Sequence, residues 1–423
     1  MKITDKILTL IAVVALSALA SPAQVTTTPY SMYGYGILND HATSMQRQMG
    51  GVGYAMNSGR QINVKNPASY AYCDSLTFLW DVGADISFLH STEGDLKENS
   101  IGGGLDYLTM QFPISKYMGA SIGLVPTSSV GYAFGNEIKH GAMENQGSGG
   151  LNELYAGVAG RYAGVSLGVN FSYMFGSIVN DVYATPQDSK QTLFEHVMQI
   201  RDWNVNIGLQ YTLPVTKYDF VTLGVTFRPK KTFLGKTWVT NQNLSDSKQL
   251  PDTVAYMKMK DRYYQPNTYG VGLGYRHDRQ SHFMVEADFT FQDWSKAQYS
   301  PLYSTADPKV MVFEGMKFNN RYRASLGAEY TNRIRGPYLR RITYRAGGYF
   351  SQDYLNIRGN KVKEFGLSCG LGFPTADGKT LINLGFDWKH RQASPQKLIS
   401  ENYFNITLGV NFNEVWFWQR KIK

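Results

Sequence analysis

Apolar and polar residues alternate with a period of two along several long stretches of this chain. From Phe78 to Phe88 every second side chain is apolar, and the positions between them include Asp81, Asp85 and Ser87. Similar alternation covers residues 165–176, 283–292 and 404–412. A strand with one face toward lipid and the other toward a wet lumen requires this pattern. The pattern therefore predicts β-strands that cross a membrane.

Fourteen such segments are expected, an even number, and most of their connections alternate between short turns and longer loops. Short turns typically lie in the periplasm, which would place both chain ends there. We expect an all-β fold, a transmembrane antiparallel β-barrel of about fourteen strands. A soluble β-sandwich is the alternative, but it would bury one strand face behind Leu and Val. The expected strands are 76–90, 103–113, 117–135, 151–160, 164–176, 200–213, 219–235, 265–276, 281–293, 320–331, 340–352, 363–373, 379–390 and 401–412.

The composition agrees with a membrane barrel. Aromatic residues make up 14% of the chain, with 29 Tyr and 22 Phe, whereas charged residues make up only 18%. Tyr and Phe suit strands and the aromatic girdles at the two membrane interfaces. The net charge of +9 is spread over loops and turns, with no basic run of five or more. We therefore expect contact with outer-membrane lipids and lipopolysaccharide, and no nucleic-acid partner.

The N-terminus has the features of a signal peptide, residues 1–23. Lys2 and Lys6 precede the apolar stretch 7–20, and the small residues Ser21 and Ala23 flank Pro22 ahead of a cleavage site. No later apolar stretch approaches the roughly 20 residues that a spanning helix needs. The expected location is the outer membrane of a Gram-negative bacterium. The barrel would occupy residues 76–412 and an aromatic, basic periplasmic tail residues 413–423.

Residues 24–75 lack alternation and contain two compact motifs. A fourteen-stranded barrel is wide enough to leave an open lumen, so we expect this segment to fill it as an N-terminal hatch or plug. The motif residues are Gly50, Gly51 and Gly53, and Asn66, Pro67 and Ala68.

With this leader, these motifs, fourteen strands and an apolar-aromatic last strand, the chain resembles the FadL family of outer-membrane transporters for long-chain fatty acids and other hydrophobic compounds. It also looks like the related PorV barrels of the type nine secretion system. The resemblance implies passive uptake of a hydrophobic or amphipathic ligand through the hatch and a lateral opening beside an interrupted third strand. It also implies that the outer loops after the fifth and seventh strands collect the ligand.

Candidate residues for these roles can be named. Pro126, Thr127, Ser128 and Ser129 interrupt the third strand and form the candidate lateral gate, although a mere bulge explains the proline equally well. In the loops, the spacing of four apolar residues matches one face of a short helix. The candidate ligand-collecting residues are Leu193, Phe194, Val197, Met198, Tyr263 and Tyr264.

The expected lumen row is charged, with both signs present, and would form a hydrated, salt-bridged interior that grips the hatch. A transporter of hydrophobic ligands would need a more apolar path through the lumen. A second hypothesis is therefore a non-transporting structural or assembly subunit of an outer-membrane complex for secretion or barrel assembly. Its partners would be other barrels or lipoproteins. The lumen residues are Asp81, Asp85, Glu286, Asp288, Arg323, Glu329, Arg345 and Asp387.

Catalysis is not expected. The G-x-S-x-G motif occurs around Ser121, Ser166 and Ser368, but each copy lies inside an alternating strand rather than at a strand-to-helix turn. The seven His residues lack metal-ligand spacing, and two Cys residues cannot form a tetrahedral zinc site. We expect neither a metal nor another cofactor.

Overall fold

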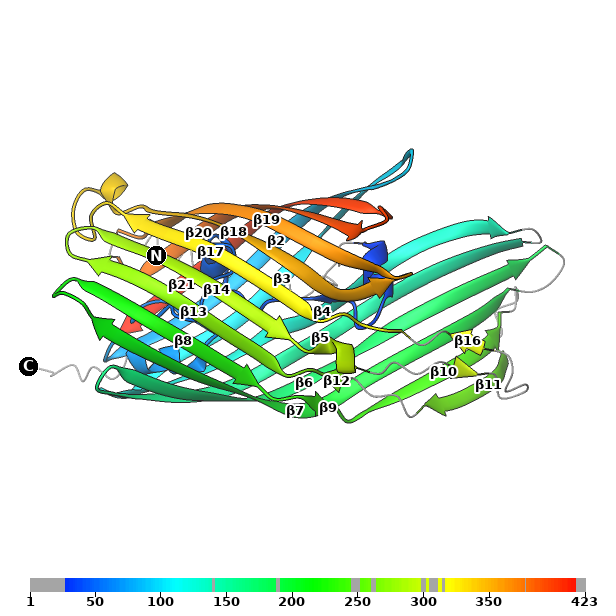
Figure 1. Ribbon diagram of the computed structural model, residues 1–423, viewed down its shortest axis with the longest axis horizontal. Coiled ribbons are helices and arrows are strands. Elements are labelled where there is room, and N and C mark those ends of the chain that lie inside the picture. Colours follow the sequence, from blue (N-terminus) through cyan, green and yellow to red (C-terminus); the bar gives the residue numbers. More distant parts are fainter. Residues whose placement is uncertain are drawn as a thin grey trace, which may run out of the picture.

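The computed structural model describes residues 27–138, 141–187, 191–244, 252–259, 264–297, 302–303, 311–313, 316–376 and 378–415. They form a closed antiparallel β-barrel of fourteen strands, as predicted. The ring closes where β2 pairs with β21, in register from Thr77 opposite Val415 to Thr92 opposite Ser400. We call the end where β2 begins and β21 stops the near end, and the opposite end the far end (Figure 1).

The barrel strands follow the chain around the ring, each bonded to its sequence neighbours. Between β8 and β13 the chain adds a short detour, β9 to β12. The barrel strands are β2 (Thr77–Glu93), β3 (Leu96–Ser115), β4 (Met118–Ile138), β5 (Gly141–Tyr162), β6 (Val165–Pro186), β7 (Thr192–Pro214), β8 (Asp219–Arg228), β13 (Thr268–Asp278), β14 (His282–Gln292), β17 (Arg321–Thr331), β18 (Thr343–Ile357), β19 (Asn360–Pro374), β20 (Thr380–Ser394) and β21 (Ser400–Val415).

The alternation that predicted the strands reflects two different environments. On β6 the odd-numbered positions Val165 to Tyr173 are exposed on the outer face, whereas Ser166 and Asn170 point inward and are buried. Exposed apolar side chains form a continuous band on the outer faces of the other barrel strands as well. We call this band the lipid-facing belt, because such a surface is stable in lipid and not in water.

The strands are much longer on one side of the barrel than on the other. β4 to β7 contain 21 to 23 residues each, whereas β13, β14 and β17 contain 11 each. The long strands continue past the far end as a wall (Figure 1). Residues 136–150 and 177–199, expected as outer loops, therefore belong largely to hairpins of this wall. That expectation was wrong because alternation disappears where neither face of a strand contacts lipid.

The wall also includes part of the segment 236–264, which the sequence suggested to be a loop. β10 (Gly235–Asn243) continues the line of β8 and pairs with β7, and β11 (Asp252–Met259) pairs with β10. The remaining short strands are β9 (Lys231–Thr232) with β12 (Tyr264–Gln265), and β15 (Leu302–Tyr303) with β16 (Met311–Phe313). Two 3-10 turns, η3 (Trp294–Lys296) and η4 (Tyr338–Arg340), lie in the connections.

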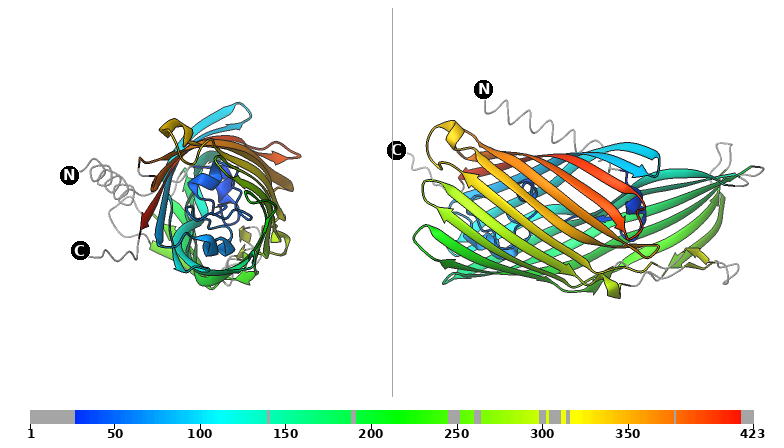
Figure 2. Two further views of the ribbon diagram at one scale, coloured as in Figure 1. Left: turned by 90° about the vertical axis from the view of Figure 1, so that its left-hand side faces the viewer. Right: turned by 45° about the horizontal axis from the view of Figure 1, so that its top comes forward.

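The described residues that precede β2, 27–76, lie inside the ring, as Figure 2 shows in the view along the barrel. Their elements are short: η1 (Pro29–Met32), β1 (Ile37–Leu38), α2 (Ser44–Arg47) and η2 (Pro67–Tyr72). The amide of Thr27 donates to Ser100, four residues beyond the start of β3, so the segment begins toward the far end and reaches the near end at β2. The two ends of the chain, expected together in the periplasm, lie outside the described residues, so that expectation stays a prediction.

The expected boundary between barrel and tail shifts at the C-terminus. β21 continues to Val415, which pairs with Thr77, so residues 413–415 belong to the barrel rather than to a separate tail. Residues 416–423 lie outside the described residues, as does the signal peptide, 1–23.

Candidate functional site

The N-terminal segment fits the lumen because glycines on the inner face of the strands leave room for it. A Cβ at Gly224 would lie 1.8 Å from the carbonyl oxygen of Tyr54, and one at Gly168 would lie 2.4 Å from the carbonyl carbon of Pro67. Inward Cβ atoms at Gly347 and Gly327 would lie 2.2 Å from the carbonyl carbon and 2.3 Å from the carbonyl oxygen of Met49. Many glycines of this chain are therefore explained by close contact with the N-terminal segment. In the sequence, this contact is visible only as glycines at the inward-facing positions of a strand.

Both predicted motifs are buried against the barrel wall. Gly50 and Gly51 adopt φ values of +69° and +82°, a left-handed conformation that favours glycine. The amide of Gly50 donates to the Ser368 hydroxyl at 2.8 Å. In the second motif, the Asn66 side chain accepts from the amide of Ala68 and donates to the Tyr54 carbonyl at 2.6 Å. These residues hold the segment in its path; a gating role for them stays a prediction.

Asp40 is the central anion of the segment. Its carboxylate lies 2.7 Å from a guanidinium nitrogen of Arg321 on one side and of Arg323 on the other. Burial alone would raise the pKa of Asp40, but Arg323 and Arg321 outweigh it and hold the pKa below its usual range. The segment is therefore attached to β17 by a paired charge that is expensive to remove.

Arg47 forms the opposite link, from α2 to the other side of the barrel. Its guanidinium lies 2.7 Å from Asp106 on β3 and 3.8 Å from Asp85 on β2. Burial would lower the pKa of Arg47, but the carboxylates of Asp106 and Asp85 raise it above the ordinary value. Arg47 and Asp40 together connect one short peptide to three strands.

Glu286 and Asp288 bind the backbone of the segment instead of a side chain. Glu286 accepts from the amide of Ala55 at 2.7 Å, and Asp288 accepts from the amide of Gly53 at 2.8 Å. Lys65 lies 3.9 Å from the same Asp288 carboxylate. These contacts satisfy backbone donors that a buried peptide would otherwise leave unpaired.

The remaining predicted lumen residues also point inward. Arg345 pairs with Glu329 at 2.5 Å and donates to Gln48 at 3.0 Å, whereas Asp81 accepts from Tyr107 at 2.9 Å. Asp387 accepts from Asn405, and Ser368, from one of the G-x-S-x-G motifs, serves as an acceptor for the hatch rather than sitting at a turn. Sequence reasoning missed several partners that only the fold brings inward: Asp40, Arg47, Lys65, Arg321, Glu364, Lys389, Arg391 and Glu401.

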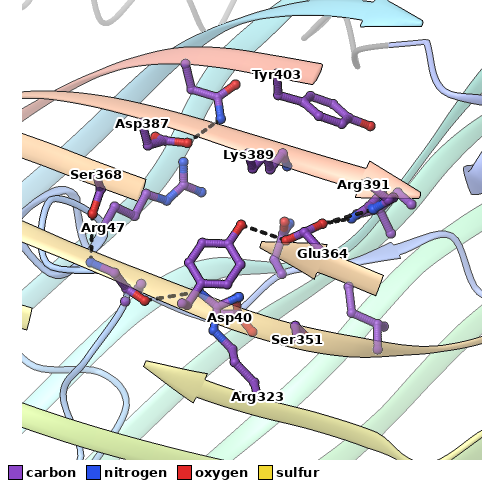
Figure 3. Close-up of a pocket in the computed structure, with 18 of the residues that line it drawn as sticks. Asp40, Arg47, Arg323, Ser351, Glu364, Ser368, Asp387, Lys389, Arg391 and Tyr403 are labelled. Carbon is purple, nitrogen blue, oxygen red and sulfur yellow. Dashed lines mark hydrogen bonds and ion pairs between the residues drawn. The ribbon is translucent and has the colours of Figure 1, made fainter. Parts of the chain in front are cut away.

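A small polar cavity remains between the segment and strands β17 to β21. It measures about 200 Å³ and is lined by Asp40, Arg47, Asp387, Lys389 and Arg391 (Figure 3). Two further spaces beside residues 39–41 measure about 100 Å³ and 10 Å³. Figure 3 shows carboxylates and guanidiniums pointing toward one another across the largest space, which suits water and ions rather than an apolar ligand.

The candidate lateral gate lies at a seam between β3 and β4. The ladder between these strands extends only from Ser115 opposite Met118 to Leu108 opposite Leu124. Beyond it, β4 carries a bulge between Pro126 and Ser128 and pairs with β5 alone among the barrel strands. The predicted interruption is therefore present as a bulge inside a long strand.

The N-terminal segment covers this free edge of β4. β1 pairs with it, Ile37 opposite Ser129 and Leu38 opposite Ser128. The amide of Thr28 donates to the carbonyl of Gly131 at 2.7 Å, farther along the same edge. Thr127 and Ser128 are buried as a result. The seam is thus closed by the chain's own N-terminus.

An apolar cluster closes the lumen toward the far end. Tyr30 and Tyr35 of the N-terminal segment pack with Trp294, Phe318 and Tyr354. The ring centroids of Trp294 and Tyr354 lie 4.6 Å apart. Between the charged residues around Asp40 and the far end, the lumen is therefore filled by aromatic side chains.

The candidate ligand-collecting residues do not form a short helix. Leu193, Phe194, Val197 and Met198 all belong to β7, which pairs there with β6 and with β10. Their spacing matched a helix because both faces of this part of β7 are covered, so apolar residues occur on each. Tyr264 lies in β12 and packs against the apolar cluster, and Tyr263 lies outside the described residues.

The described residues lack two further features. No helix among them is long and apolar enough to cross a membrane. Nor does any group of three or more His, Cys, Asp or Glu residues within them have the arrangement of a metal site.

Several solved structures share this fold. The chain has a TM-score of 0.62 with the Ralstonia pickettii toluene transporter TbuX, at 14% identity over 88% of this chain and 99% of that one. For the Pseudomonas putida toluene transporter TodX the TM-score is 0.64, at 14% identity over 90% and 100%. For a Pseudomonas aeruginosa FadL homologue it is 0.61, at 11% identity over 89% and 99%. The FadL-like fold is confirmed; at these identities the likeness extends to the fold alone.

Comparison with curated proteins finds no match. A family model does match, over residues 3–423, and its description is BamG. The match spans the hatch, the barrel and the far-end wall, so membership rests on the whole chain rather than on one motif. The chain belongs to the BamG family.

Proposed function

We propose that this protein is a non-transporting subunit of an outer-membrane protein complex, of the kind that secretes proteins or assembles barrels. The observation that carries the proposal is the blocked lumen. The N-terminal segment is held by charges on β2, β3, β14 and β17, and the largest of the three lumen spaces beside residues 39–41 measures about 200 Å³. Sites for small apolar molecules are usually larger, about 300–1,000 Å³, and mostly apolar.

Opening such a lumen would be costly. Moving the segment would separate Asp40 from Arg321 and Arg323, and Arg47 from Asp106, which leaves several buried charges without partners. Breaking a single buried pair typically costs about 3–5 kcal/mol. A rigid, filled barrel instead offers a stable surface for other proteins. Membership of the BamG family leaves this role open.

The orientation follows from the position of the lipid-facing belt. At the near end, exposed apolar residues such as Tyr162 and Leu213 stand directly beside the turns, whereas at the far end the wall continues well beyond the belt. Bacterial barrels have short periplasmic turns and long external segments. We place the near end in the periplasm of a Gram-negative bacterium and the wall outside the cell.

A second candidate is passive uptake of a hydrophobic or amphipathic compound. A cavity of about 570 Å³ at the far-end rim, between the β2–β3 hairpin and the N-terminal segment, favours it. Tyr30, Tyr33 and Phe134 line this cavity, and it lies near the β3–β4 seam. The fold shared with the toluene transporters TodX and TbuX supports the same reading. Entry from this cavity would require the N-terminal segment to leave the seam.

A disulfide across the seam separates the two candidates. Ile37 and Ser129 are direct partners on antiparallel strands, so their Cα atoms lie at about 4.5–5.5 Å, a separation that a disulfide spans. The double variant I37C/S129C is made with Cys369→Ser, which removes the exposed free thiol. Each single cysteine variant serves as the matched control. The readouts are recovery of the native complex in mild detergent and uptake of a hydrophobic fluorescent probe.

We expect the oxidised double variant to remain in a stable complex with other outer-membrane proteins, and probe uptake to be equal in oxidised and reduced cells. Uptake that falls on oxidation and returns on reduction would establish transport. A wild-type protein that is recovered only as a monomer would overturn the proposed subunit role.

A further inference from the structure

The turn between β17 and β18, residues 332–342, carries an unusual concentration of arginine. We call it the arginine turn. It contains Arg333, Arg335, Arg340 and Arg341, and no lysine or acidic residue. Every residue from 332 to 340 is exposed. Four positive charges thus stand on one short peptide at the near end.

These guanidiniums have no acidic partner within 4 Å among the described residues. The nearest turn, between β13 and β14, follows Asp278, the last residue of β13, but Arg276 and His282 already bind that carboxylate at 2.9 Å and 2.5 Å. The same turn adds Arg279, also exposed and without an acidic partner among the residues described. The local charge is therefore uncompensated, unlike that of the lumen arginines.

The arginine turn is nevertheless well ordered by its own backbone. The amide of Arg333 donates to the carbonyl of Arg340 at 2.8 Å, and the amide of Arg341 donates to the carbonyl of Tyr338 at 2.9 Å within η4. The amide of Ile334 donates to the carbonyl of Gln280 at 3.0 Å, which attaches the turn to its neighbour. A preformed surface loses less entropy on binding than a flexible one.

The turn also projects farther than the others at this end. The other five near-end turns contain two to five residues, whereas this one contains eleven. It stands clear of the strands at the near end of Figure 1, where the chain changes from yellow to orange. Its apolar side chains are exposed too: 74% for Leu339, 47% for Tyr338 and 46% for Ile334.

We propose that the arginine turn is a docking surface for a periplasmic protein partner with an acidic surface patch. This deepens the proposed subunit role and rests on it. The planar guanidinium binds carboxylates through two parallel hydrogen bonds, and Arg and Tyr are enriched where partners bind tightly. Leu339, the most exposed apolar side chain of the turn, supplies an apolar contact next to Arg340 in the sequence.

The distribution of charge favours a protein over anionic lipid head groups. A lipid surface surrounds the barrel, so binding to lipid would be served by cations on every near-end turn. The other near-end turns carry at most one cation each, Lys116, Lys217, Arg279 or Lys379, whereas this turn carries four, all of them arginine, and extends beyond the belt residues Tyr330 and Tyr344. A single projecting site matches one partner at one position.

The test places a photo-crosslinking amino acid at Leu339 in the full-length protein, in intact outer membranes. The variant R333Q/R335Q/R340Q removes three charges. The variant R333K/R335K/R340K keeps the charges but cannot form the two parallel hydrogen bonds of a guanidinium. The matched control is K116Q/K217Q, which removes exposed cations from two other near-end turns. Phosphatidylglycerol vesicles, mixed with the purified protein, measure binding to lipid directly.

We expect one discrete protein adduct whose crosslinked peptide is rich in Asp and Glu. Its yield should fall about tenfold in the glutamine variant, partly in the lysine variant and not in the control, since each exposed pair contributes a modest amount. An adduct insensitive to the glutamine changes overturns the surface, as does a charge-dependent adduct with lipid alone. If the native complex is recovered but no adduct forms at Leu339, the arginine turn is not a docking surface and the proposed subunit role is unaffected. If the protein is recovered only as a monomer, both proposals are wrong.

Discussion

A guanidinium nitrogen of Arg323, on the barrel wall, lies 2.7 Å from a carboxylate oxygen of Asp40, on the N-terminal segment. The same guanidinium stacks on the ring of Tyr349, 3.5 Å from its centroid. One arginine therefore joins the peptide in the lumen to both β17 and β18. Much of the strength with which the segment is held should depend on this contact.

Removing the carboxylate should show this directly. In D40A, Arg321 and Arg323 keep their charges without the buried partner, and we expect unfolding in urea to become easier by about 3–5 kcal/mol. The matched control is D74A, because Asp74 pairs with Arg60 at 3.4 Å on an exposed surface. There we expect a loss below about 1 kcal/mol. Equal losses in the two variants would contradict the central role of Asp40.

The inward glycines give a second test. In G224A the new methyl group would collide with the Tyr54 carbonyl, which also accepts hydrogen bonds from Gln210 and Asn66. We expect a loss of about 1–3 kcal/mol and faster proteolysis of the N-terminal segment. G160A is the control, since its nearest atom would be 3.8 Å away. Unchanged protection of the segment in G224A would show that the contact is not needed.

His41 makes the stability of the segment depend on pH. Burial lowers the pKa of His41 to about 4; Glu153, 3.8 Å away, opposes this and Arg228 adds to it. The unfolded chain binds a proton at His41 below about pH 6.5 while the folded chain does not, so stability falls as the pH drops from 6.5 toward 4.

We expect the wild type to lose up to about 2 kcal/mol between pH 7.5 and pH 5 from this group. The H41Q variant should lose correspondingly less over the same interval. Thermal unfolding at the two pH values measures the difference. A steeper loss in H41Q would show that His41 is protonated in the folded protein.

The lipid-facing belt predicts where a charge is tolerated on β6. Val169 lies in the middle of the exposed apolar positions of this strand, whereas Thr185 lies in the wall beyond them. In phospholipid vesicles, V169R should reduce the free energy of unfolding by about 2–4 kcal/mol, and T185R by less than about 1 kcal/mol. A similar cost at both positions would mean that the wall also contacts lipid.

The strands within the belt could be predicted from the sequence because lipid and lumen impose opposite demands on neighbouring residues. That contrast ends where the wall leaves the lipid, so residues 177–199 looked like a loop with a helical patch although they are strand. The inward direction of polar side chains such as Asp288 and Arg345 could be predicted, because alternate residues of a strand face opposite sides of the barrel. Their partners could not, since Asp40 and Arg47 lie in a segment without periodicity, and only the fold brings them to Arg323 and Asp106.

The path of the N-terminal segment changes the number of times that the chain crosses the barrel. An even number of strands returns a chain to the side on which it began, and β2 and β21 do meet at one end of this barrel. The segment that precedes β2 runs the length of the lumen in the opposite sense, from beside Ser100. With that internal pass, the described residues from 27 to 415 cross the barrel an odd number of times, so labels attached near Thr27 and near Val415 would report from opposite ends of the barrel.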